Sequence, residues 1–295
     1  MTALSLTEWR LYNLLQNDMY WKIRYKDDFG IPEKQLANWK QEYDKKLSVV
    51  LSAVRMNSRA LENVYRQTEE ICMAAVQHHG SALEYVKKQT PELCLAAVQQ
   101  NGRALQYVRE QTDEICMAAV QHHGWALEYV KVQTPEICLA AVKKTGEILE
   151  FVKEQTPDIC MAAVQKCGWA LEFVEEQTTE IFLAAVKKNG LALYYVKVQT
   201  EDICLEAVQE YGMTLEYVEE QTEEICLEAV QQEGRALQFV KEQTPEICLA
   251  AVQQDGGALK YVKVQTEEIC LAAVQECGWA LQYVKVQTPE TRQRC

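Results

Sequence analysis

The sequence has no long apolar run and little positive charge. Its apolar stretches are no longer than the six residues of ICLAAV, whereas a membrane-spanning helix needs about 20. The start, MTALSLTEWR, lacks the basic segment and apolar stretch of a secretory signal peptide. Lys and Arg number 30 against 43 Asp and Glu, which gives a formal net charge of −13. We therefore expect a cytoplasmic protein with neither a membrane nor a nucleic-acid partner, because an acidic surface repels phosphate.

Glycine, proline and histidine are also scarce, and the glycines are regularly placed. Ten of the 12 glycines recur every 22 residues, and the dipeptide Gln-Thr recurs at the same interval from Gln67 to Gln287 without an insertion. Ten repeats therefore occupy residues 67–286, and a degenerate repeat precedes them at 45–66. This organisation leaves 1–44 as a separate non-repeat segment and 287–295 as a tail.

Each repeat has the same helix signals. Numbered from its Gln, the repeat reads Q-T-x-[ED]-I-C-[LM]-A-A-V-Q-x-x-G-x-A-L-x-[YF]-V-x-x. Thr at position 2 is a helix N-cap, and Pro follows it in four repeats, where the first turn tolerates it. Acidic residues beside it favour the positive end of the helix dipole. We expect Gly at position 14 to end this first helix in the left-handed conformation.

The second part of the repeat predicts a shorter helix that packs on the first through Leu, Tyr or Phe, and Val. The first helix is apolar nearly all round, so we expect it to be sandwiched. The Ala at position 9 predicts close approach between helices. Because one repeat cannot bury these faces alone, the fold class is an all-α solenoid of short two-helix repeats. Gly in every period and Thr-Pro in four of them exclude a coiled coil, and the leucine-rich and 34-residue tetratricopeptide patterns are absent.

Residues 91–108, PELCLAAVQQNGRALQYV, closely resemble the domain-of-unknown-function family 4116 of bacteria and giant viruses. The resemblance extends over residues 67–288. It implies a repeat protein, in the host cytoplasm if the source is viral. It implies no activity and no cofactor.

Residues 4–30 resemble the second half of an F-box, which has a Trp helix followed by D-x-x-x-W-K-x-x-Y-x-x-D-F. The matching residues are Trp9, Leu14, Asp18, Trp21, Lys22, Tyr25, Asp28 and Phe29. The opening Leu-Pro helices of an F-box, which make most contacts to a Skp-type ubiquitin-ligase subunit, have no counterpart here. Two interpretations stay open: a helical cap on the solenoid, or a working substrate adaptor.

We expect no catalytic, cofactor or metal site. The histidines form two adjacent pairs, His78-His79 and His122-His123, within the copied string ICMAAVQHHG, and neighbouring side chains in a loop diverge. Cysteine occupies position 6 in nine repeats, as a buried apolar residue would. No histidine or carboxylate accompanies it at nucleophile spacing. Cys167 and Cys277 precede a Gly, and we expect them to be more exposed.

The variable residues on either side of the Gly corner are the candidate binding surface. Positions held constant are scaffold, whereas positions 13 and 15 differ from repeat to repeat. The candidate ridge at position 15 consists of Arg103, Trp125, Trp169, Leu191, Met213, Arg235 and Trp279. Trp, Arg and Met are enriched at protein interfaces. The alternative is that these side chains pack under the next repeat.

The leading functional hypothesis is a non-catalytic scaffold that binds a protein or peptide along this ridge, with an F-box-like adaptor as its most specific form. The rival is a structural component, such as a virion part, in which the solenoid serves as a spacer. The spacer hypothesis predicts self-association and tolerance of the Trp125→Ala and Trp169→Ala substitutions together.

Overall fold

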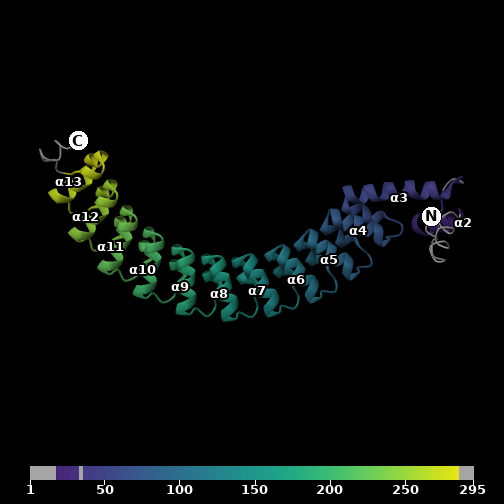
Figure 1. The fold of residues 1–295 in the computed structure, drawn as a ribbon, viewed down its shortest axis with the longest axis horizontal. Coiled ribbons are helices and arrows are strands. Elements are labelled where there is room, and N and C mark those ends of the chain that lie inside the picture. The colour runs from purple at the N-terminus through teal and green to yellow at the C-terminus, as the bar shows by residue number, and fades with distance from the viewer. Residues whose placement is uncertain (1–17, 33–35, 286–295) are drawn as a thin grey trace, which may run out of the picture. The chain divides into compact units, whose positions relative to one another are not determined.

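The computed structural model describes residues 18–32 and 36–285, and every regular element in this part of the chain is a helix (Figure 1). The all-α solenoid of 22-residue repeats is therefore confirmed. The chain divides into two compact units, residues 1–141 and 142–295, which are described separately. Residues Trp9 and Leu14 and the tail 287–295 lie outside the described residues.

Long α-helices alternate with short 3₁₀ helices along both units. The first unit contains α2 (Asp18–Phe29), α3 (Trp39–Met56), η1 (Ser58–Asn63), α4 (Glu69–His78), η2 (Gly80–Tyr85), α5 (Pro91–Gln100), η3 (Gly102–Tyr107), α6 (Asp113–His122) and η4 (Gly124–Tyr129). Helix α7 (Pro135–Lys144) spans the boundary between the units. The second contains η5 (Gly146–Phe151), α8 (Pro157–Lys166), η6 (Gly168–Phe173), α9 (Thr179–Lys188), η7 (Gly190–Tyr195), α10 (Glu201–Glu210), η8 (Gly212–Tyr217), α11 (Glu223–Gln232), η9 (Gly234–Phe239), α12 (Pro245–Gln254), η10 (Gly256–Tyr261), α13 (Glu267–Glu276) and η11 (Gly278–Tyr283).

The Thr at position 2 caps the α-helix, as its sequence context predicts. In repeat 1 the Thr68 hydroxyl accepts a hydrogen bond from the Ile71 backbone N–H at 3.4 Å. The same bond recurs in every repeat except repeat 7, where Thr200 makes no side-chain cap. A capping hydroxyl satisfies one of the backbone donors that the first turn leaves without an intrahelical partner. The sequence therefore locates the start of each α-helix correctly.

The Gly at position 14 does not end the helix in the left-handed conformation, so that prediction is wrong. Among the described residues only Gly30 has a positive φ. The α-helix ends instead at position 13, where His79 is extended (φ −141°, ψ 102°) and donates its N–H to the Ala75 carbonyl. Glycine is required for close packing, because a Cβ at Gly190 would lie 2.6 Å from the Ala207 carbonyl oxygen of the next repeat. The predicted close approach at the position-9 Ala is confirmed.

The α-helix is not sandwiched on all sides. In α10, Ile203, Cys204, Ala207 and Val208 are buried, whereas position 7 (Leu205) is only half-buried. The buried stripe faces the 3₁₀ layer, since α10 packs on η7 and η8 as well as on α9 and α11. The helix is therefore sandwiched between its partner 3₁₀ helix and the neighbouring repeats, as expected, while a two-layer solenoid leaves its outer face towards solvent.

The Gln at position 1 joins successive repeats through its side-chain amide. Gln221 Nε2 donates to the Leu215 carbonyl of the preceding repeat at 3.3 Å and to the Phe239 carbonyl of its own repeat at 3.0 Å. Its Oε1 accepts from the Lys241 backbone N–H at 2.9 Å and from the Cys226 thiol at 3.7 Å. The Gln-Thr spacing reveals the period, but it does not reveal this function of Gln.

The first prediction concerns the close approach at Gly. Replacing Gly234 with Ala puts a Cβ 2.5 Å from the Ala251 carbonyl oxygen, whereas the equivalent Gly278 has nothing within 4 Å. We expect Gly234→Ala to lower the free energy of unfolding by about 1–3 kcal/mol and Gly278→Ala to leave it nearly unchanged. Urea denaturation followed by circular dichroism measures both. Equal effects of the two substitutions would contradict the packing function.

The second prediction concerns the glutamine amide. Gln221→Met keeps the length of the side chain but removes two donors and an acceptor, which leaves backbone groups unpaired. We expect a loss of about 1–3 kcal/mol in the free energy of unfolding. The control is Gln231→Met, at an exposed position on α11, with an expected change of less than about 0.5 kcal/mol. Indistinguishable unfolding midpoints for the two variants would show that the Gln221 amide does not stabilise the contact between repeats.

Candidate protein-binding surface

The predicted ridge residues all occupy the second position of a 3₁₀ helix, next to the corner with the preceding α-helix. Exposed members are Arg103, Trp169, Arg235 and Trp279, and half-buried members are Trp125, Leu191 and Met213. Within each unit, equivalent positions therefore recur from one 3₁₀ helix to the next. Whether this ridge binds a partner stays a prediction.

Two ridge side chains illustrate how this position meets the next repeat. Trp169 packs edge-on against Tyr195, with ring centroids 5.8 Å apart, yet remains 38% exposed. Arg235 pairs with Asp255 at 3.1 Å. Trp279 is 81% exposed. Packing under the next repeat and exposure to solvent are thus combined in one side chain rather than being alternatives.

A second surface feature escapes the sequence analysis, which assigns the position-19 aromatic residue to packing alone. The structure leaves this ring half-buried in all ten repeats. The residues are Tyr85, Tyr107, Tyr129, Phe151, Phe173, Tyr195, Tyr217, Phe239, Tyr261 and Tyr283. The sequence did contain a signal for this exposure, because every repeat has Tyr or Phe at position 19. A Tyr ring often packs on one side and keeps its polar end in contact with water.

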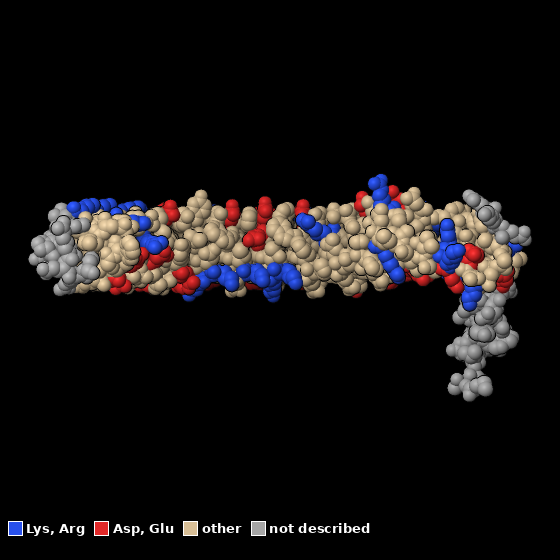
Figure 2. Space-filling view, turned by 90° about the horizontal axis from the view of Figure 1, so that it is seen from above, with Lys and Arg blue, Asp and Glu red and all other residues tan. Residues whose placement is uncertain are grey.

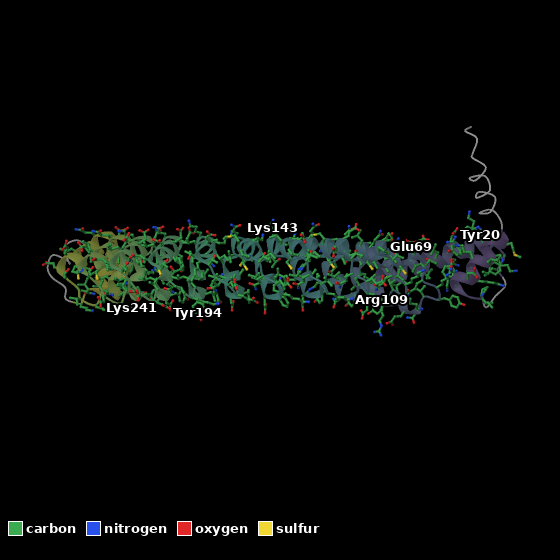
Figure 3. All side chains as sticks on the ribbon, turned by 90° about the horizontal axis from the view of Figure 1, so that it is seen from below. Tyr20, Glu69, Arg109, Lys143, Tyr194 and Lys241 are labelled. Carbon is green, nitrogen blue, oxygen red and sulfur yellow. The ribbon has the colours of Figure 1, made fainter. Side chains whose placement is uncertain are left out.

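Charge is unevenly distributed in the second unit. Exposed lysines occupy the C-terminal ends of α7, α8 and α9; they are Lys143, Lys144, Lys166, Lys187 and Lys188. Figure 2 shows a blue band of basic side chains along part of the lower edge. Figure 3 shows Lys143 and Tyr194 on opposite sides of the molecule. The α layer is therefore locally basic, although the chain as a whole is acidic.

The F-box-like residues that are described lie at the start of the first unit, where α2 packs on α3. Trp21 is buried with Trp39 and Tyr43, and Tyr25 and Phe29 are half-buried against the same cluster. Asp18 Oδ1 accepts a hydrogen bond from the Trp39 backbone N–H at 3.2 Å. These side chains therefore hold two helices together.

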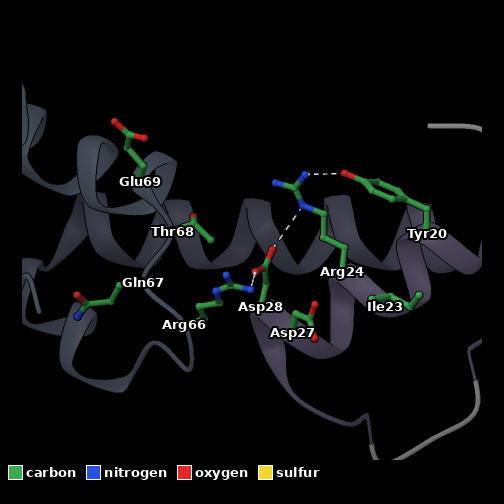
Figure 4. Close-up of a pocket in the computed structure, with 9 residues that line it drawn as sticks. All are labelled: Tyr20, Ile23, Arg24, Asp27, Asp28, Arg66, Gln67, Thr68 and Glu69. Atoms are coloured by element: carbon green, nitrogen blue, oxygen red, sulfur yellow. Dashed lines mark hydrogen bonds and ion pairs between the residues drawn. The ribbon is translucent and has the colours of Figure 1, made fainter. Parts of the chain in front are cut away.

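A cleft of about 500 Å³ separates α2 from the start of repeat 1 (Figure 4). At its floor the buried carboxylate of Asp28 lies 3.5 Å from Arg24 and 3.4 Å from Arg66. It also accepts a 2.9 Å hydrogen bond from the Tyr43 hydroxyl. Burial raises the pKa of Tyr43, and the bond to Asp28 adds to this rise, whereas Arg24 opposes it. Asp28 thus ties α2, α3 and the chain entering repeat 1 together.

The repeated cysteines are buried and reduced. Each position-6 thiol lies against the position-1 amide, as Cys94 does with Gln89 Oε1 at 3.7 Å. Burial raises the pKa of eight of these thiols, to about 11 for Cys72 and Cys204. A thiol with so high a pKa is a poor nucleophile at neutral pH. The cysteines at position 6 are therefore core residues.

One histidine side chain pairs with the backbone of the preceding repeat. His122 Nδ1 accepts a hydrogen bond from the Gly102 N–H at 3.2 Å. Gln100 Oε1 does the same for Gly80 at 2.7 Å. In the described part of the chain, no cluster of three or more His, Cys, Asp or Glu residues is arranged to hold a metal ion. Because Gln replaces His without changing the contact, His122 needs no metal to explain it.

Sequence comparison places the repeats in a known family. Nine overlapping matches to the family described as Domain of unknown function (DUF4116) run from residues 68–112 to residues 244–287, and each spans two successive repeats. Together they cover about three quarters of the chain. The chain belongs to this family. No curated protein and no solved structure matches the chain.

The helices of the described residues include none that is both long and apolar enough to cross a bilayer.

The third prediction concerns thiol reactivity, measured with a disulfide reagent in a Cys295→Ser background. Cys167 and Cys277 are half-exposed, so we expect both to react in the native protein while the nine position-6 thiols react only on unfolding. Burial, with a contribution from Glu147, raises the pKa of Cys167 above its usual value of 9.0. Its rate should therefore keep rising with pH through pH 9, because the thiolate reacts. Rapid labelling of more than two thiols at neutral pH would contradict the buried core.

Proposed function

We propose that this chain is a non-catalytic scaffold that binds a protein partner through the variable side chains of its 3₁₀ layer. The observation that carries the proposal is the exposure of large side chains at position 15 within the array, where Trp169 is 38% exposed and Arg103 and Arg235 are also exposed. The neighbouring positions 14, 16 and 17 are constant and buried in repeats 5 and 6. A rigid array that holds variable Trp, Arg and Met side chains at regular intervals is how other repeat solenoids present binding surfaces.

We propose no catalytic role and no cofactor, because the repeated cysteines and His122 have structural roles. The repeated thiols have raised pKa values because they are buried, and His122 accepts a backbone hydrogen bond that Gln100 supplies equally well in another repeat. Eleven cysteines of the described residues are free thiols, which suits a reducing compartment. We therefore propose the cytoplasm as the location.

A sharper form of the proposal makes the N-terminal segment a ubiquitin-ligase adaptor. Its F-box-like aromatic residues are used in packing between α2 and α3, which favours a cap on the solenoid. Exposed apolar side chains remain on α2, with Met19 60% and Ile23 54% exposed. A Skp-type subunit would have to bind there. Absence of binding between the full chain and a purified Skp-type subunit removes the adaptor form and leaves the scaffold intact.

The fourth prediction tests the scaffold itself. The chain, cross-linked in cell extract, should capture a defined protein, and the Arg103→Ala, Trp169→Ala and Arg235→Ala triple variant should lose it. The matched control changes three exposed residues of the α layer, Gln99, Gln165 and Gln231, to Ala. We expect at least a tenfold loss for the ridge variant, since interface Trp and Arg each contribute more than about 1 kcal/mol. Equal capture by both variants would place the binding surface elsewhere.

A further inference from the structure

The aromatic surface is widest in repeats 5 to 7. Tyr194 packs edge-on against Tyr195 at 5.0 Å and against Tyr217 of the next repeat at 5.3 Å. Trp169 contacts Tyr195 from the preceding repeat at 5.8 Å. Four rings from η6, η7 and η8 therefore form one continuous cluster. It remains accessible, because Tyr194 is 63% exposed.

Carboxylates surround this cluster. The exposed segments of residues 168–220 that lie outside the α-helices carry six glutamates and one lysine. The glutamates are Glu172, Glu175, Glu176, Glu216, Glu219 and Glu220. Lys197, the one cation, lies 3.5 Å from the Glu175 carbonyl oxygen. Burial, and then a hydrogen bond with Glu172, raise the pKa of Tyr195, which places that carboxylate beside the rings. The surface is therefore both aromatic and acidic.

This combination suits a cationic partner. A guanidinium or ammonium group is attracted to the face of an aromatic ring within about 6 Å, and a neighbouring carboxylate strengthens the attraction. Apart from Lys197, the exposed lysines of these repeats lie on α8 and α9 rather than on the 3₁₀ helices; they are Lys166, Lys187 and Lys188. An anionic partner would therefore be attracted to the α layer and repelled by the aromatic cluster.

The repeat spacing sets the form of that partner. Packed helices lie roughly 8–10 Å apart, so equivalent sites on η6, η7 and η8 recur at about that interval. A polyproline II chain advances about 3.1 Å per residue with three residues per turn. Every third side chain then points the same way at about 9 Å intervals, which matches one side chain to each repeat. An α-helical partner would place its neighbouring turns only about 5.4 Å apart.

We propose that the aromatic and acidic surface of η6, η7 and η8 binds an extended peptide segment that carries Arg or Lys at every third residue. One cation lies in each repeat, at the equivalent side chains Glu172, Tyr194 and Glu216, beside the rings of the cluster. This inference rests on the proposed scaffold function and specifies the chemistry of its partner.

The fifth prediction uses fluorescence anisotropy of a labelled peptide that contains four Arg-Pro-Pro units. The full chain should bind it saturably, with a dissociation constant on the order of 100 µM or tighter. A peptide of the same composition with its four arginines adjacent should bind at least about fivefold more weakly, because only one or two cations then reach rings. Affinity should fall as NaCl is raised from about 50 to about 300 mM.

Two variants locate the site. Trp169→Ala with Tyr194→Ala should weaken binding about fivefold to tenfold, and Glu172→Gln with Glu216→Gln should weaken it and reduce its salt dependence. Tyr65→Ala is the matched control, because it removes an aromatic ring that is 70% exposed in the degenerate repeat, outside the ridge and the cluster; its affinity should be unchanged. Thermal unfolding followed by circular dichroism verifies that each variant is folded. If the Trp169–Tyr194 variant does not fold, the Glu172–Glu216 variant still tests the site, because it leaves the aromatic rings in place.

Three results would overturn the inference: no saturable binding, equal affinity for the two peptides, or equal effects of the Tyr65 and Trp169–Tyr194 substitutions. Self-association of the native chain that is lost in the Trp169–Tyr194 variant would assign the surface to a second copy, which also overturns it. If the ridge variant abolishes capture of a protein while the peptide does not bind, the scaffold function stands and only its cationic partner fails. If neither is bound, both proposals fail.

Discussion

The side-chain amide of the repeated Gln is the interaction on which the stack depends. The loops between repeats are extended, so their backbone groups have no helix of their own in which to pair. In repeat 8, Gln221 donates to a carbonyl of each of two repeats and accepts from a backbone N–H. A buried polar group left unpaired costs about 1–3 kcal/mol. One amide per repeat satisfies several such groups and fixes the distance between neighbours.

The short second helix is possible only because that distance is small. Six residues of 3₁₀ helix bury little surface by themselves, yet Leu193 and Val196 are buried because η7 is held against two α-helices. The close contact of Gly190 with the Ala207 carbonyl sets the same spacing at the opposite edge of the repeat. Gln at one edge and Gly at the other hold the two layers close together. Ala at position 9 is fully buried in this space, whereas position 6 accepts either Cys or, in repeat 6, the buried Phe182.

The same geometry creates the exposed surface. A two-layer stack has two outer faces, and the position-15 and position-19 side chains lie on the 3₁₀ face. Trp169 reaches across to Tyr195 of the next repeat and keeps 38% of its surface in water. Substitution at these positions changes the surface without disturbing the core. The charges then differ between faces, with lysines on the α layer of α7, α8 and α9 and glutamates beside the rings.

Much of this architecture was predictable from the sequence, because a strict period leaves few alternatives. Two helices per repeat follow from the 22-residue interval. Their boundaries follow from the Thr N-cap and from the end of the α-helix just before Gly. These are local properties, set by hydrogen bonding within a few residues of Thr68 or His79. The mutual spacing of Gln-Thr and Gly likewise determines that all repeats adopt one conformation.

Only the tertiary structure decided what Gly, Gln and the aromatic residues do. Gly looks like a left-handed helix end in sequence, but its conformation is ordinary and its neighbour in the next repeat explains it. Gln221 bonds to the Phe239 carbonyl 18 residues away, and Trp169 contacts Tyr195 26 residues away, in contacts that no local pattern encodes. The aromatic cluster of Trp169, Tyr194 and Tyr217 exists because stacking brings three repeats together. Sequence determined the repeat, whereas stacking decided which of its faces remain exposed.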